Sequence, residues 1–268
     1  MISCVKRGSE RSHEFTVPLG IKQGGINSPD FFSCYYDGLT GLVRDANIGC
    51  YIRDMCLSII LFADDLVLVA PTRSALQRLI DSCSDYCTKL GIAFNSRKSK
   101  VMVFGKCKVD LESIRPILLN NSKVEVVSRI KYLGTTIVSN PNFAFIAEAD
   151  LVSFYRSANS VLNVIKKPDE IVQMQLLFTN CVPTLTYACA GKEFSAREMA
   201  DCNTALNSAI RKVFSFQRWE SIRHLREGCG YSSLHEIFAK AKNNFEKSLP
   251  NHENPVLSFL YCINSMDQ

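Results

Sequence analysis

The tetrad Phe-Ala-Asp-Asp at residues 62–65 constrains the fold more than any other feature, because it places two adjacent carboxylates between two apolar runs. These runs occupy residues 57–61 and 66–70 and are rich in Ile, Leu and Val. A bilayer-spanning helix is excluded, since each charge near the bilayer centre is energetically costly. Two short apolar runs around a polar turn predict a β-hairpin with Asp64 and Asp65 at the turn.

Paired carboxylates on a tight turn suit Mg²⁺, because hard cations prefer oxygen ligands. The Asp64-Asp65 dipeptide is also common in turns that bind nothing. The hairpin alone therefore leaves both interpretations open.

A glycine-rich segment lies about forty residues upstream, with the sequence GIKQGGINSPDFF at residues 20–32. Ser28 followed by Pro29 predicts the start of a helix, with Ser28 as its N-cap. The expected apolar face of that helix consists of Phe31, Tyr35, Leu39 and Leu42. The two glycines allow the backbone to approach a ligand closely, and the Gln23 amide offers both donors and acceptors.

The segment after the tetrad predicts a second amphipathic helix, which begins with a capping box at residues 74–77 and ends at Gly91. A strand is expected at residues 101–104. From Arg97 to Lys108 the chain carries five Lys or Arg and no acid, which fits either a solvated edge or a nucleic-acid contact. A short apolar turn follows at residues 130–134.

The two ends of the chain show weaker patterns. Residues 2–17 predict a hairpin with its turn at residues 6–9. Residues 146–166 predict a helix that Pro168 stops, and Asp169 is expected to cap the next helix, which Pro183 ends. Residues 209–219 interleave basic and aromatic side chains, which fits a nucleic-acid groove but is more typical of an amphipathic helix with a solvated basic face.

Composition indicates a folded intracellular protein, with nuclear or cytoplasmic location left open. The 268 residues are 47% hydrophobic and carry a net charge of +5, which permits nucleic-acid binding. The twelve cysteines include no Cys-x-x-Cys pair, and several lie in apolar surroundings. We therefore expect reduced, buried thiols at Cys34, Cys56, Cys83 and Cys87 rather than disulfides or a zinc site.

Four segments in this order, GIKQGGINSP, FADD, GIAFNSRKSK and KYLG, resemble successive blocks of reverse transcriptases, most closely those of non-LTR (LINE-type) retrotransposons. The resemblance covers about residues 14–135. It implies an α+β fold: a partial polymerase palm, with an antiparallel sheet and packed helices, at residues 1–140, and an α-helical thumb-like region at residues 141–268. The domain boundary is expected within residues 136–145.

The resemblance also implies roles for individual residues. Asp64 and Asp65 match the catalytic, metal-binding acids, and Lys98 matches the lysine that approaches the nucleotide triphosphate. Three further residues match the loop along template and nucleotide: Gln23, Gly24 and Gly25. The primer-grip turn is matched by Tyr132, Leu133 and Gly134. The implied cofactor is Mg²⁺, and the implied partners are an RNA template, a DNA primer and deoxynucleotides, with no membrane.

The chain departs from the family pattern at its beginning. Family members supply another metal-binding aspartate from a strand before the glycine-rich block, whereas the acids at that end here are Glu10 and Glu14. The expectation is therefore an N-terminally truncated reverse transcriptase fragment that lacks an upstream segment of the parent polymerase. The alternative is a catalytically inactive, nucleic-acid-binding or structural relic of such an enzyme.

Overall fold

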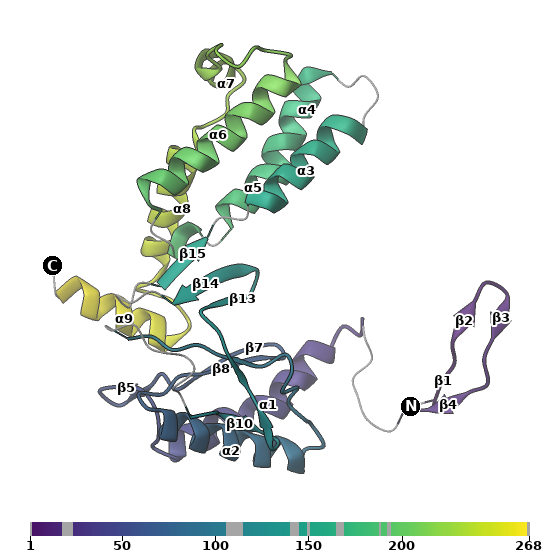
Figure 1. Cartoon of the computed structure of the whole chain (residues 1–268), viewed down its shortest axis with the longest axis vertical. Coiled ribbons are helices and arrows are strands. Elements are labelled where there is room, and N and C mark those ends of the chain that lie inside the picture. Colours follow the sequence, from purple (N-terminus) through teal and green to yellow (C-terminus); the bar gives the residue numbers. More distant parts are fainter. Residues whose placement is uncertain are drawn as a thin grey trace. The chain divides into compact units, whose positions relative to one another are not determined.

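The computed structural model describes residues 2–17, 24–105, 115–139, 145–148, 151–164, 169–187, 189–191 and 194–266. The chain divides into two compact units, one formed by Met1–Val101 with Ser113–Glu125 and the other by Met102–Glu112 with Val126–Gln268. Figure 1 shows the elements of both units in sequence colours. Each unit has its own hydrophobic core.

The first unit is organised around helix α1 (Ser28–Asp45), helix α2 (Arg73–Lys89) and a hairpin of strands β7 (Ile59–Phe62) and β8 (Asp65–Leu68). Its core consists of side chains from the two helices, namely Tyr36, Leu39, Val43, Leu79, Cys83 and Cys87. Burial of Cys83 and Cys87 confirms the prediction that these thiols belong to the core. One face of the hairpin packs onto this core, so the acidic turn is anchored on both helices.

The predicted apolar face of α1 is only partly confirmed, because Leu39 is buried and Leu42 packs against the core whereas Phe31 and Tyr35 do not. Tyr36, Leu39 and Val43 are buried, whereas Phe31 and Tyr35 are 63% and 53% exposed. Both stripes have helical spacing, and contact with α2 selects the one that is buried.

The helix starts also differ from the predicted caps by one or two residues. Asn27 is the N-cap of α1, and Ser28 is the first helical residue. Thr72 caps α2 by accepting a hydrogen bond from the Ala75 amide, instead of the predicted Ser74. The Gln77 side chain, expected in a capping box, instead bonds with the backbone of Leu118.

The remaining sheet elements of the first unit are short antiparallel pairs. The N-terminal hairpin is confirmed, since β1 (Ile2–Ser3) pairs with β4 (Phe15–Thr16) and β2 (Lys6–Arg7) pairs with β3 (Glu10–Arg11). Its turn is shorter than the predicted residues 6–9, because Lys6 and Arg7 belong to β2. Two further pairs join β5 (Tyr51–Ile52) to β6 (Met55–Cys56) and β10 (Leu118–Leu119) to β11 (Ser122–Lys123). Strand β9 (Lys100–Val101) pairs with β12 (Glu125–Val126). Residues 102–105 are irregular, so the strand expected at 101–104 is only partly formed.

The second unit begins with a three-stranded antiparallel sheet of β13 (Arg129–Tyr132), β14 (Thr135–Ser139) and β15 (Phe145–Glu148). Strand β15 corrects the prediction that a helix starts at residue 146, since pairing with β14 overrides the local helical pattern. Helix α3 starts only at Leu151.

Helices make up the rest of the second unit, and Figure 1 shows them in green and yellow. They are α3 (Leu151–Val164), α4 (Glu170–Leu176), the π-helical turn η1 (Leu177–Cys181), α5 (Val182–Thr186), the short turn η2 (Cys189–Gly191), α6 (Ala196–Val213), α7 (Arg223–Gly228), α8 (Leu234–Ser248) and α9 (Pro255–Met266). Their core includes Phe154, Met174, Leu177, Leu206, Ile210 and Leu234. Among the described residues, no helix has the length and apolarity needed to cross a bilayer.

Two helix boundaries test the local sequence rules. Asp169 caps α4 as predicted, because its carboxylate accepts a hydrogen bond from the Ile171 amide at 2.7 Å. Pro183 does not end the helix, which continues to Thr186. The wider turn η1 immediately precedes Pro183 and accommodates a residue that has no amide hydrogen to donate.

The architecture confirms an α+β class with helices and small antiparallel sheets. The predicted boundary between residues 1–140 and 141–268 concerns functional domains and stays a prediction, and residue 140 lies outside the described residues.

Candidate active site

The acidic turn has the predicted geometry. Strands β7 and β8 are antiparallel, with Phe62 opposite Asp65, so Ala63 and Asp64 form a two-residue loop. Both carboxylates belong to exposed residues. Ala63 has φ +50°, a left-handed conformation that costs roughly 1 kcal/mol for a residue with a Cβ. The packed hairpin thus holds a strained turn at which two consecutive acidic residues are exposed.

The hairpin is amphipathic in a way that fixes its orientation. Ile59, Leu61 and Leu66 pack toward the core of the first unit. The alternate residues Ile60 and Phe62 point the other way and are 52% and 61% exposed. A one-residue slip in register would exchange these two faces, so core packing determines which side the turn presents.

The base of the hairpin is fixed by Ser58, which is fully buried. Its Oγ accepts a hydrogen bond from the Cys50 amide at 2.8 Å and donates one to the Cys50 carbonyl at 3.1 Å. Its carbonyl accepts the Val69 amide at 2.8 Å, which closes the hairpin. Gly49, with φ +115°, permits this approach, since an added Cβ would lie 2.3 Å from the Ser58 Oγ.

The same junction changes the chemistry of Cys56. Burial by itself raises the pKa of this thiol. Hydrogen bonds from Ser58 and Tyr51, with the positive charge of Arg44, outweigh burial and hold the pKa of Cys56 below its ordinary value. The described cysteines are all free thiols, and Cys34 is exposed, contrary to the prediction that it is buried.

The acidic turn is electrostatically linked to α1. Burial, the neighbouring Cys87 and the carboxylate of Asp64 all raise the pKa of Tyr36, in that order of size. The field of Asp64 therefore reaches a buried side chain on the helix that follows the glycine-rich segment. Gln23 lies outside the described residues. Gly24 has φ +80° with open space around its α-carbon, and the Gly25 carbonyl accepts the Ser28 amide at 3.2 Å.

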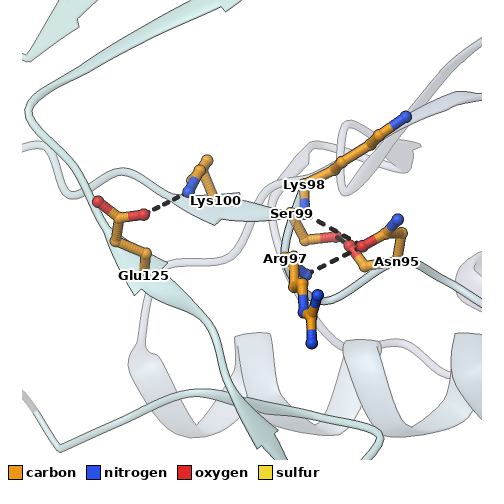
Figure 2. A network of polar contacts seen from close by, with 6 residues as sticks. All are labelled: Asn95, Arg97, Lys98, Ser99, Lys100 and Glu125. Atoms are coloured by element: carbon orange, nitrogen blue, oxygen red, sulfur yellow. Dashed lines mark hydrogen bonds and ion pairs between the residues drawn. The ribbon is translucent and has the colours of Figure 1, made fainter.

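The basic segment forms a compact turn, drawn in Figure 2, in which Asn95 organises the backbone. The Asn95 side chain accepts hydrogen bonds from the amides of Arg97 and Lys98 at 3.1 and 3.3 Å. Arg97 and Lys98 are exposed, and their side chains extend in different directions. Lys100 instead forms an ion pair with Glu125. Of the three, Lys100 is thus the one held by a carboxylate, and Lys106 and Lys108 lie outside the described residues.

The turn at Tyr132-Leu133-Gly134 belongs to the second unit and connects β13 to β14. Leu133 and Gly134 both have positive φ, at +45° and +80°, as the tight turns of twisted hairpins require. The Tyr187 hydroxyl donates a hydrogen bond to the Leu133 carbonyl at 2.7 Å. A Cβ on Gly134 would lie 3.0 Å from the Tyr187 ring, so this ring lies directly against the turn. The sequence analysis missed Tyr187, which is 54 residues away from Leu133 and has no local signal.

The carboxylate oxygens at the acidic turn suit a hard cation, but only two described residues provide them. Asp64 and Asp65 provide adjacent, exposed oxygen ligands. Across the described residues, no group of three or more His, Cys, Asp or Glu side chains is placed to hold a metal ion. The described acids at this turn could therefore provide only part of a metal site.

Comparisons with known proteins point to one family. The family model for reverse transcriptase (RNA-dependent DNA polymerase) matches residues 2–137, slightly more than half of the chain. The Pol polyprotein of the type-2 retrotransposable element R2DM of Drosophila melanogaster is 33% identical over 129 residues, which are 46% of this chain and 12% of that protein. The Pol polyprotein of the type-1 element R2 of Popillia japonica is 23% identical over 208 residues, which are 75% of this chain and 28% of that protein.

The chain spans little more than a quarter, at most, of the length of these relatives. Both relatives are Pol polyproteins of R2 retrotransposable elements, which supports the resemblance to LINE-type enzymes. The matched segment contains the acidic hairpin, the basic turn and the Tyr132 turn. The chain belongs to the reverse transcriptase family.

Proposed function

We propose that this chain is part of an RNA-directed DNA polymerase of a retrotransposon, in which Asp64 and Asp65 bind catalytic Mg²⁺. The observation that carries the proposal is that Asp64, in the loop, and Asp65, at the start of β8, are both exposed at the end of a hairpin packed against α1 and α2. A rigid element is needed, because catalytic geometry tolerates errors of only about 0.5 Å.

Within this proposal, Asp64 is the more central ligand because it occupies the loop itself, whereas Asp65 begins β8. When bound, Mg²⁺ ions activate the attacking 3′ oxygen and offset charge on the leaving pyrophosphate. The two carboxylates would hold the cations in place. A third carboxylate would come from a polypeptide segment other than those described.

Lys98 is proposed to approach the triphosphate of the incoming deoxynucleotide. Two observations support this role. Lys98 is exposed on a turn that Asn95 holds, and among the described residues it does not share the carboxylate that pairs with Lys100. A cation near the transferred phosphates would offset their charge in the transition state. Gln23, Gly24 and Gly25 are proposed to lie along template and nucleotide.

The second unit is proposed to contact the primer. Tyr132, Leu133 and Gly134 form the end of a hairpin, and a primer-grip role is supported by the way Tyr187 braces the turn. In this proposal, residues 1–140 form a partial palm and residues 141–268 a thumb-like region. The partners are an RNA template and a DNA primer.

The proposal is tested by primer extension on an RNA template with a DNA primer, deoxynucleotides and Mg²⁺. The chain alone should show almost no extension, because its described residues supply only two acids, Asp64 and Asp65, to the metal site. A chimera that places the corresponding upstream palm segment of the R2DM polyprotein before residue 1 should extend the primer.

Matched variants make this result specific. Asp64→Ala in the chimera should abolish extension, whereas Asp81→Ala removes an acid from α2 and should not. If the chimera is folded and binds the hybrid but stays inactive, the alternative of a catalytically inactive relic is favoured. If the chain alone extends primers and loses this activity with Asp64→Ala, the inference of an incomplete metal site is wrong.

A further inference from the structure

The one tryptophan of the chain, Trp219, is 82% exposed. It lies in the loop between α6 and α7 of the second unit, outside the helix predicted over residues 209–219, which ends at Val213. A side chain of this size normally contributes buried area to a core or an interface. Its exposure leaves a large aromatic face available for contact.

The turn that carries Trp219 is fixed by its own hydrogen bonds. The Phe216 amide bonds to the Arg211 carbonyl at 2.9 Å, and Arg211 Nε donates to the Glu220 carbonyl at 3.0 Å. The Glu220 amide bonds to the Gln217 carbonyl at 3.1 Å, and its carboxylate accepts the Gln217 amide. The indole is thus presented on a preorganised loop, which lowers the entropic cost of binding.

The segment around Trp219 carries a net positive charge. Residues 211–227 contain five basic side chains, Arg211, Lys212, Arg218, Arg223 and Arg226, against two acids. Glu227 and Arg223 pair with each other at 2.9 Å, and the Glu220 carboxylate accepts the Gln217 amide within the turn. The surface therefore complements a polyanion.

A polar cavity of about 490 Å³ adjoins the start of this loop. Its lining includes Asn159 and Asn163 from α3, Glu170 and Gln173 from α4, and Lys212 from the last turn of α6. Primary amides present donors and acceptors together, the pattern that matches the edges of nucleobases. Lys212 belongs to both the cavity and the basic loop.

We propose that the Trp219 loop binds single-stranded nucleic acid, by stacking a base on the indole while Lys212 and Arg218 contact phosphates and the cavity beside Lys212 accepts another base of the same strand. An acidic peptide would satisfy the charge but not the aromatic face or the amides. A membrane surface would need a continuous apolar face, whereas Trp219 is flanked by Arg218 and Glu220. This site is separate from the acidic hairpin and does not use nucleotide transfer.

The test uses tryptophan fluorescence of the whole chain, excited selectively over tyrosine, because Trp219 is the one tryptophan. Single-stranded RNA and DNA oligonucleotides of twelve bases should quench it, and an abasic oligomer with the same number of phosphates should not. The abasic oligomer should also bind about fivefold to a hundredfold more weakly, which is the usual contribution of one stacked base. Comparison of the RNA with the DNA oligonucleotide shows which of the two nucleic acids the site prefers.

Charge variants provide the matched control. Arg218→Ala should weaken binding. Arg197→Ala should not, because Arg197 lies in the first turn of α6, roughly 20 Å along the helix from the last turn that precedes the Trp219 loop. Asp64→Ala should leave the quenching unchanged, so this test and the polymerase proposal fail independently. Absence of quenching at low salt, equal binding of abasic and normal oligomers, or quenching only by vesicles rich in phosphatidylserine would each overturn the proposal.

Discussion

Ser58→Ala should loosen the hairpin that carries Asp64 and Asp65. The variant removes a fully buried Oγ that accepts the Cys50 amide at 2.8 Å. The Cys50 carbonyl keeps a partner, because the Leu57 amide also bonds to it at 2.8 Å. The amide is then the group that loses its partner, and an unsatisfied buried donor costs about 1 to 3 kcal/mol.

The expected loss in the free energy of unfolding is about 1 to 2 kcal/mol, since Ser58 is fully buried and Cys50 is partly buried. That range corresponds to roughly a 5- to 30-fold change in the folded-to-unfolded ratio. Urea unfolding followed by circular dichroism measures it. Hydrogen exchange should also accelerate at the amides of Cys50 and Val69, which the junction protects.

A second readout follows from Cys56, whose pKa the Ser58 hydrogen bonds hold down. In Ser58→Ala, the pH midpoint of Cys56 alkylation should therefore move upward. Ser33→Ala is the control, because Ser33 makes an exposed hydrogen bond to Pro29 within α1 and its loss should cost less than about 0.5 kcal/mol. If both variants are equally stable and Cys56 titrates unchanged, the junction does not support the hairpin.

Three further outcomes are expected. Lys98→Ala should reduce the slope of log affinity against log salt for an RNA–DNA hybrid by about one in a filter-binding titration. Lys100→Ala should change this slope less, because Glu125 already pairs with Lys100, and equal effects of the two variants would contradict this. Tyr187→Phe should lose the exposed hydrogen bond to the 132–134 turn and destabilise the chain by about 0.5 kcal/mol in urea unfolding, and an unchanged midpoint would count against the brace. Burial raises the pKa of Cys83 from 9.0 to about 12, so folding favours the protonated thiol and stability should fall between about pH 9 and 12. Cys83→Ala should weaken this pH dependence of stability, and identical pH profiles for the variant and the original chain would refute it.

The acidic hairpin was predictable because its signal is local. Apolar runs on both sides of Asp64 and Asp65 must be buried, while the acids must not, and only a turn satisfies both conditions. Gly91 likewise ended α2 as expected, with φ +73° and the reverse hydrogen bond from the Ile92 amide to the Cys87 carbonyl.

The predictions were wrong where contacts between residues far apart in the sequence determine the local structure. In α1 the sequence offers two apolar stripes, and the one containing Tyr36 is buried because α2 supplies Cys83 and Cys87 opposite it. Strand β15 forms because β14 offers it a pairing edge, which no local pattern at residues 145–148 reveals. The contact of Tyr187 with the 132–134 turn also joins segments that are far apart in sequence.

Binding of Mn²⁺, as a paramagnetic substitute for Mg²⁺, tests the central role of Asp64 and Asp65 most directly. Titration of the isotope-labelled chain should selectively broaden the amide resonances of residues 62–66 and then those around Tyr36, whose pKa already senses the Asp64 charge. Asp64→Asn combined with Asp65→Asn should abolish this broadening, whereas Asp81→Asn should leave it intact. Broadening that is uniform over the surface, or that persists without both carboxylates, would contradict the assignment of this turn as the metal-binding part of a polymerase site.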